Sequence, residues 1–269
     1  CRVAEPGRIY LRLVGARVRS QLEYRGSLAM QLVGTTAITV IDFVAIVVLF
    51  QSVDALDGWT LEEIALLYGI ATVSFALTDL AVGHLDLFPQ MIRDGTFDQL
   101  LVRPLPSLLQ VIASDFSLRR LGKALQGLAV LMFALTRLEL DWTAAKVVVL
   151  VVAILAGTVI YAAVWIALAT VAFWIVDAIE FVNAFTYGGS YLAQYPITIF
   201  SRWLRGLVLF VLPVAFVSYF PALVLLERES GLLIPAELGY LTALVAAAAA
   251  VLAALAWNGA VRHYRSAGG

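Results

Sequence analysis

Few residues in this sequence could carry out chemistry by themselves. The 269 residues include two histidines, His84 and His263, and one cysteine, Cys1, which is too few for a metal cluster or a histidine-based catalytic set. A phosphate-binding loop of the form Gly-x-x-x-x-Gly-Lys-Ser/Thr is absent, because the one Gly-Lys pair, at 122–123, is followed by alanine. We therefore expect no catalytic residue, no metal site and no cofactor on this chain.

The clearest local pattern of polar residues lies in residues 83–120, between two apolar runs. Gly95 is placed to end one short helix, and Thr96, three residues before Gln99, is placed to begin another with a capping box. Pro104 ends this second helix. The expected apolar face consists of Phe97, Leu100 and Leu101, and the charged rim of Arg93, Asp94, Asp98 and Arg103. The alternative is an interfacial helix that only connects the two runs.

The composition indicates what must position this segment. Apolar residues make up 62% of the chain and charged residues 14%, against about 25% charged residues in soluble domains. A soluble domain of this size cannot bury so much apolar surface. The apolar runs are continuous over about 20 residues, as in membrane-spanning helices, rather than alternating as in barrel strands. The sequence thus predicts an all-α polytopic membrane protein and excludes a soluble enzyme, a disordered chain and a nucleic-acid-binding domain.

Six membrane spans are expected, with polar connections whose charges give the orientation. The spans are predicted at about 28–50, 61–82, 118–136, 145–170, 204–226 and 238–258, and the fifth is expected to be bent or interrupted at Pro213 and Pro221. If the N-terminus is cytoplasmic, every lysine and arginine except Arg137, Lys146 and Arg228 lies on the cytoplasmic side, while the outer loops are acidic. Both termini are therefore expected in the cytoplasm, and the membrane is expected to be the plasma membrane, the inner membrane of a bacterium.

The first 27 residues are basic and precede the first apolar run. On a helix, Arg8, Arg12 and Arg19 share one side, while an apolar stripe forms another. This pattern favours an amphipathic helix (1–27) that lies on the membrane surface with its arginines toward anionic head groups; the alternative is a solvated basic tail. Because the sequence begins with Cys1 rather than methionine, we expect it to start inside a longer chain or after a processing site.

Some residues within or beside the spans are candidates for a transport path. Asp42 lies near the middle of the first span, where an ionised carboxylate is costly unless it faces protein or water. We expect it to line a substrate path with Thr39, or to be paired inside the bundle. Residues 187–195 are expected to form an interfacial turn, and the outer loop 227–237 either a short re-entrant segment or a plain connector.

Residues 92–105, with the sequence Ile-Arg-Asp-Gly-Thr-Phe-Asp-Gln-Leu-Leu-Val-Arg-Pro-Leu, resemble a family signature. The pattern I-R-x-G-x-[FL]-D-x-x-L-x-[RK]-P-[LI] is typical of the ABC-2 type transporter permeases. The chain is also similar to this family in its basic start, its six apolar runs, Tyr195–Pro196 and the ending that begins at Trp257 and contains Gly259, Tyr264, Ser266 and Gly268.

The resemblance implies the permease subunit of an ATP-binding-cassette exporter, with an interfacial elbow helix (1–27), a transmembrane domain (28–269) and a coupling segment (83–117). Two cytoplasmic ATPase subunits would bind ATP and Mg²⁺, and a second permease chain would complete the complex in the lipid bilayer. A different permease chain is favoured, and the alternative is a second copy of this one. The cargo would be amphipathic or hydrophobic, and no nucleic acid would bind. The residues implied in ATPase coupling are Ile92, Arg93, Asp94, Gly95, Phe97, Asp98, Leu101, Arg103 and Pro104. The alternatives are a stand-alone secondary transporter or channel, and a membrane-embedded lipid enzyme.

Overall fold

The structure, a computed structural model, describes residues 15–16, 18–114, 117–175, 179–232 and 234–264. Its longer helices are α2 (Arg25–Leu49), α3 (Leu61–Val82), α7 (Leu121–Arg137), α8 (Ala144–Ala169), α9 (Ile179–Leu192) and α12 (Thr242–His263). The shorter ones are α4 (Phe88–Arg93), α5 (Thr96–Leu101), α6 (Ser107–Ala113), α10 (Arg202–Gly206) and α11 (Tyr219–Leu226). No strand occurs in these residues, so the expected all-helical fold is confirmed for them.

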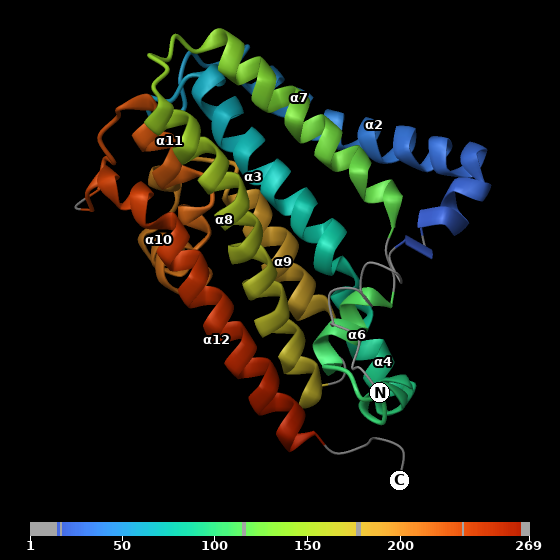
Figure 1. The fold of residues 1–269 in the computed structure, drawn as a ribbon. Helices are drawn as coiled ribbons and strands as arrows, with labels where there is room; N and C mark the ends of the chain where they lie inside the picture. Colours follow the sequence, from blue (N-terminus) through green and yellow to red (C-terminus); the bar gives the residue numbers. More distant parts are fainter. Residues whose placement is uncertain (1–14, 17, 115–116, 176–178, 233, 265–269) are drawn as a thin grey trace.

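Helix α3 forms the centre of the bundle. It packs against α7 and α8, and α12 packs on α8 (Figure 1). A Cβ atom on Gly69 of α3 would lie 2.7 Å from the backbone of Leu131 in α7, and the Thr78 hydroxyl of α3 donates to the Thr158 carbonyl of α8 at 2.9 Å. Close backbone approach and interhelical hydrogen bonds hold helices together where lipid replaces water. Helices α3, α7 and α8 therefore form a tight core.

Among the described residues, four helices are long and apolar enough to cross a membrane. They are Arg25–Leu49, Leu61–Arg93, Ala144–Phe173 and Ala236–His263, where the last three include adjoining helical turns. These helices lie where the first, second, fourth and sixth spans are expected. Helix α7 occupies the position of the third and has 17 residues, about the lower limit for a membrane-spanning helix. The chain is thus a polytopic membrane protein.

The expected span 204–226 is a bent hairpin rather than one straight helix. Its two arms meet at 75°, because the ring of Pro213 prevents the helix from continuing. Before the hairpin, the Thr198 carbonyl accepts a hydrogen bond from the Arg205 guanidinium. These two residues line one cavity with the residues that follow α11. Both ends of the hairpin therefore lie at the same end of the bundle, and the bend expected at Pro213 is confirmed.

Helix α9 includes most of the segment 187–195, for which an interfacial turn is expected. Gly188 and Gly189 do not interrupt it, since a glycine costs only about 1 kcal/mol in a helix interior, and α9 packs against α8 and α3.

The sequence also places Arg205 on the cytoplasmic side with Arg202. This is wrong for Arg205, because it lies beside Asp57 of the acidic end.

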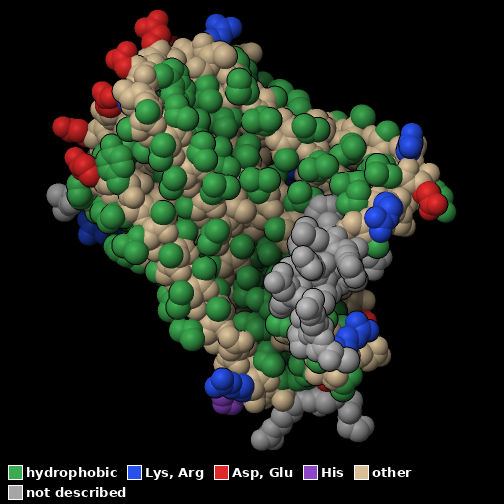
Figure 2. Space-filling view, in the orientation of Figure 1, with side chains coloured by type: hydrophobic (Ala, Val, Ile, Leu, Met, Phe, Trp, Pro, Cys, Tyr) green, Lys and Arg blue, Asp and Glu red, His purple; other side chains and the backbone are tan. Residues whose placement is uncertain are grey.

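Charged side chains divide between the two ends of the molecule. Aspartates and glutamates gather at the upper left in Figure 2, while most lysines and arginines in view lie at the right and lower edges. The upper left end holds the loops that follow α2, α7 and α11, and the lower end holds the C-terminal end of α12 (Figure 1). This division agrees with the expected basic and acidic sides of a membrane protein.

Candidate functional site

The segment 83–117, called the insert below, lies against the C-terminal ends of α8 and α12 (Figure 1). Helix α4 ends just before Gly95, which has φ +67°, a backbone conformation that glycine adopts at no steric cost. The N–H of Asp94 donates to the Gln90 carbonyl at 2.9 Å, and that of Gly95 to the Ile92 carbonyl at 3.2 Å. The predicted helix end at Gly95 is therefore confirmed.

The predicted capping box of Thr96 and Gln99 is wrong. The left-handed Gly95 itself occupies the N-cap position of α5, so Thr96 is already the first helical residue, and no side chain caps this helix. Instead, the Thr96 hydroxyl donates to the Met91 carbonyl of α4 at 3.1 Å. This bond ties α5 directly to α4 across the turn.

Phe97 is completely buried and does not belong to an exposed apolar face. Its ring packs against an aromatic cluster in which the centroid distances are 5.1 Å to Phe88, 5.6 Å to Phe173, 6.4 Å to Trp257 and 5.3 Å to Tyr264. Phe173 follows α8, and Trp257 belongs to α12. The expected apolar face of the insert is thus divided, because Phe97 joins α5 to the bundle while other apolar side chains remain outside.

Hydrogen bonds fix the loop between α5 and α6. The side-chain amide of Gln110 is buried and donates to the Leu100 carbonyl at 3.0 Å and to the Leu105 carbonyl at 2.9 Å. The indole N–H of Trp257 donates to the Ser107 hydroxyl at 3.2 Å. Between these anchor points Val102 is 86% exposed, so the loop presents an apolar tip on a fixed base.

The predicted coupling residues divide into a buried and an exposed group. Ile92 and Phe97 are buried, while Gly95 and Asp98 are half-buried. The exposed residues are Arg93, Asp94, Leu101, Arg103 and Pro104, next to Val102. An apolar centre surrounded by charged groups is typical of a surface that binds another protein. Sequence reasoning included Leu101 but missed Val102, although both close the same short helix.

The two predicted path residues lie on α2. Asp42 is partly exposed and lies within electrostatic range of Tyr68, Tyr191 and Tyr195. Among the residues that the structure describes, no cation lies within ion-pair distance of Asp42. The Thr39 hydroxyl donates to carbonyls of its own helix, at 3.1 and 3.0 Å. Thus α2 and α9 place a carboxylate and phenol groups near one another.

A buried polar network near the insert was not predicted. The Asp86 carboxylate accepts from the Trp165 indole N–H at 3.0 Å and from the Tyr187 hydroxyl at 2.7 Å. Asp79 is largely buried and forms an ion pair with Arg120 at 3.3 Å. These bonds connect the end of α3 and the helical turn after it to the turn before α7, to α8 and to α9. The sequence does show two acidic residues, Asp79 and Asp86, at the end of the second predicted span. Their partners could not be predicted, because they come from distant parts of the sequence.

Of the three arginines expected at the membrane surface, one lies within the described residues. Arg8 and Arg12 lie outside the described residues, whereas Arg19 is exposed in a helical stretch that includes residues 18–23. In the same stretch the side-chain oxygen of Gln21 accepts from the backbone N–H of Leu118 at 2.8 Å. This hydrogen bond attaches the N-terminal part of the chain to the start of α7.

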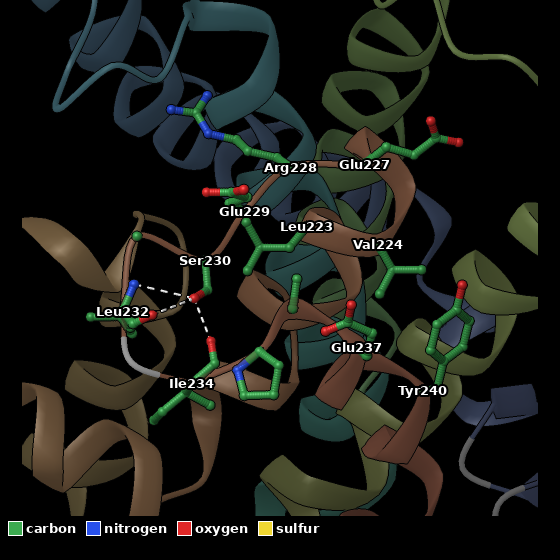
Figure 3. Close-up of a pocket in the computed structure, with 13 residues that line it drawn as sticks. Leu223, Val224, Glu227, Arg228, Glu229, Ser230, Leu232, Ile234, Glu237 and Tyr240 are labelled. Carbon is green, nitrogen blue, oxygen red and sulfur yellow. Dashed lines mark hydrogen bonds between the residues drawn. The ribbon is translucent and has the colours of Figure 1, made fainter.

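At the acidic end, Arg228 connects two loops. Its guanidinium donates to both carboxylate oxygens of Glu63, at 3.1 and 2.9 Å, and lies 4.5 Å from the centroid of the Trp59 ring. Glu227 forms an ion pair with Lys146 at 2.8 Å. Beside these pairs the loop 227–237 borders a cavity of about 670 Å³ (Figure 3). Its described residues, 227–232 and 234–235, form no helix before Ala236 and connect α11 to the last helix.

Ser230 stabilises the shape of this connector. Its hydroxyl donates to the carbonyls of Leu232 and Ile234 and accepts from the Leu232 N–H, as the dashed lines in Figure 3 show. Glu227 and Tyr240 lie on the other side of the cavity. Within the described part of the chain, no group of three or more His, Cys, Asp or Glu side chains could hold a metal ion.

Comparison with known proteins gives one match. Residues 36–268 match the model of the family described as ABC-2 family transporter protein. No curated protein and no solved structure matches the chain. The matched range includes the whole insert and every helix of the bundle, except for the first part of α2.

Proposed function

Because the chain belongs to the ABC-2 family of transporter proteins, we propose that it is the permease subunit of an ATP-driven exporter. The family forms the membrane component of ABC transporters. In the proposed complex, two cytoplasmic ABC ATPase subunits bind ATP and Mg²⁺ and supply the energy. A second permease chain, different from this one, forms the other half of the membrane part.

The observation that carries this proposal is the construction of the insert. Its base is fixed to α8 and α12 through the Phe97 cluster and the Trp257–Ser107 bond, while its apolar tip at Val102 is exposed. A subunit that binds the tip would therefore displace the ends of two helices and not a flexible loop. This arrangement suits a coupling segment that transfers a conformational change from an ATPase to the bundle.

The proposed membrane arrangement has six crossings. Helices α2, α3, α7, α8, α9 and α12 cross the bacterial inner membrane, with the insert and the C-terminal end of α12 in the cytoplasm. The hairpin 202–226 enters the membrane from the outer side and returns to it. Residues 1–27 form the elbow helix at the inner surface. The basic residues that follow the insert, Arg119, Arg120 and Lys123, and the acidic outer loops support this orientation.

The proposed cargo is amphipathic or hydrophobic. The helices provide an apolar environment in which Asp42 is the main ionisable group away from the membrane borders. Asp42, Tyr191 of α9 and Tyr195, which follows α9, are placed to line the path together with Thr39. A carboxylate in this position is costly in lipid and is retained where it faces protein or water.

Co-purification of this chain with ABC ATPase subunits from its native membranes tests the proposal. Val102→Asp places a charge on the exposed tip and should reduce recovery of the ATPase at least ten-fold, because an apolar contact at the centre of an interface is lost. The matched control is Val53→Asp in the outer loop, where the side chain is 38% exposed. Equal recovery of the ATPase with both variants, or an ATP hydrolysis rate that the permease does not change, would contradict the proposed coupling.

A further inference from the structure

A groove between α2 and α7 has no part in the contacts described so far. It has a volume of about 390 Å³, within the range of about 300–1,000 Å³ that is common for ligand pockets. One end is closed where the Thr36 hydroxyl donates to the Gly122 carbonyl at 3.4 Å. The other end is closed by the rings of Phe43 and Phe133, with centroids 6.4 Å apart. The groove therefore has a defined length.

The walls of the groove are almost entirely apolar. Val40 on α2 and Leu125 and Ala129 on α7 form its sides, and all three are exposed, while the buried Val130 lies at its base. The neighbouring outer residues of α2 are apolar and exposed along the helix, and include Ile41 and Val44. A molecule dissolved in the hydrocarbon phase of a membrane could therefore reach the groove without crossing water.

One polar atom in this groove has no partner. Gln126 is 4% exposed and lines the groove. Its side-chain N–H donates to the Tyr68 hydroxyl at 3.2 Å, but its side-chain oxygen, Oε1, accepts no hydrogen bond from the described residues. A buried acceptor without a donor is unfavourable, and the low local dielectric increases this cost. The groove thus combines an apolar channel with a single unfilled acceptor.

We propose that this groove binds a hydrophobic molecule that carries one hydrogen-bond donor, a hydroxyl group. The hydrocarbon part fills the space between Val40, Leu125 and Ala129, and the hydroxyl donates to Oε1 of Gln126. The Thr36 and Tyr68 hydroxyls already donate to backbone carbonyls. The hydrogen bond to Gln126 is therefore what distinguishes a molecule with a hydroxyl from one without. The inference concerns binding by the permease itself and does not depend on the ATPase.

Photolabelling of the full chain in lipid nanodiscs tests this site. The probes are hexadecan-1-ol with a diazirine in its chain and the methyl ether of the same compound, which has no donor. In phosphatidylcholine, a lipid without a hydrogen-bond donor, the alcohol should label peptides 36–43 and 125–133 about five-fold more than the ether, as one hydrogen bond would give. Adding phosphatidylglycerol, which carries hydroxyls, distinguishes the source: competition identifies a bilayer lipid, and no competition a free amphiphile.

Variants separate the groove from general contact with lipid. Gln126→Leu should remove the preference for the alcohol, and Ala129→Phe should abolish labelling of both peptides by filling the groove from an exposed position. The control Leu128→Phe adds the same ring on the outer surface of α7 and should change nothing. Equal labelling by alcohol and ether, or unchanged labelling in Ala129→Phe, would overturn the assignment. So would a disulfide between two copies of Ala129→Cys, since a second chain would then cover the groove.

Discussion

Removing the Phe97 ring tests whether the insert is fixed to the bundle. Phe97 is 0% exposed and contacts four aromatic rings at centroid distances of 5.1 to 6.4 Å. Replacing a buried phenylalanine by alanine typically costs about 3–5 kcal/mol, because apolar contacts are lost and a cavity remains. In Phe97→Ala this cost should fall on the local stability of α5 and its neighbouring loop, because α3, α7 and α8 pack without this ring.

Hydrogen exchange measures this local stability. Since each 1.4 kcal/mol changes an equilibrium ten-fold, the amides of residues 96–106 should exchange at least about a hundred times faster in Phe97→Ala. Amides in the middle of α3 and α8 should keep their protection. Gln99→Ala is the matched control, because Gln99 lies in the same helix but is exposed.

Two outcomes would refute this reasoning. If exchange of residues 96–106 in Phe97→Ala stayed within about three-fold of the wild type, the aromatic cluster would not stabilise the insert. If protection were lost equally in α3, the cluster would belong to the global core and the insert would not be a separate unit. The Val102→Asp variant should leave all these exchange rates unchanged, because its side chain is outside the cluster.

Other contacts give further predictions. Arg228→Met should lower stability by about 1–2 kcal/mol in thermal unfolding, because Glu63 loses a bidentate partner that is partly exposed; an unchanged melting temperature would rule this out. Gly69→Ala should cost about 1–3 kcal/mol, because its Cβ would meet the backbone of Leu131. Gly34→Ala is its control, since no atom lies within 4 Å of that Cβ, and equal melting of both variants would contradict close packing of α3 on α7.

Local sequence signals predicted local structure well. The long apolar runs coincide with α2, α3, α8 and α12, because burial in lipid requires continuous apolar helices. Gly95 is where a left-handed residue is needed, and only glycine adopts that conformation without cost. The capping box failed because the same glycine also occupies the N-cap, a detail that spacing alone does not distinguish.

Features that depend on contacts between distant residues were not predictable. An apolar residue such as Phe97 could lie on an exposed apolar face or in the core of the bundle. Only the positions of Phe173 and Trp257 decide that its ring points into the bundle. Likewise, Pro213 predicts a bend within segment 204–226, but not the end of the bundle to which the second arm returns. That direction is seen only in the structure, where Arg205 and Thr198 line one cavity with the residues that follow α11. The partner of Asp79 also comes from another helix.

The burial of Phe97 changes how the insert would act in a transporter. A force on the exposed tip would reach α8 and α12 first, because packed rings deform little and connect Phe97 to both helix ends. Helix α2, in contrast, packs mainly against α7 and the turn before it, and most of its surface is exposed. Moving α2 relative to the bundle therefore breaks few contacts. Under the proposed function, the groove between α2 and α7 is the site whose shape would respond most to such a movement.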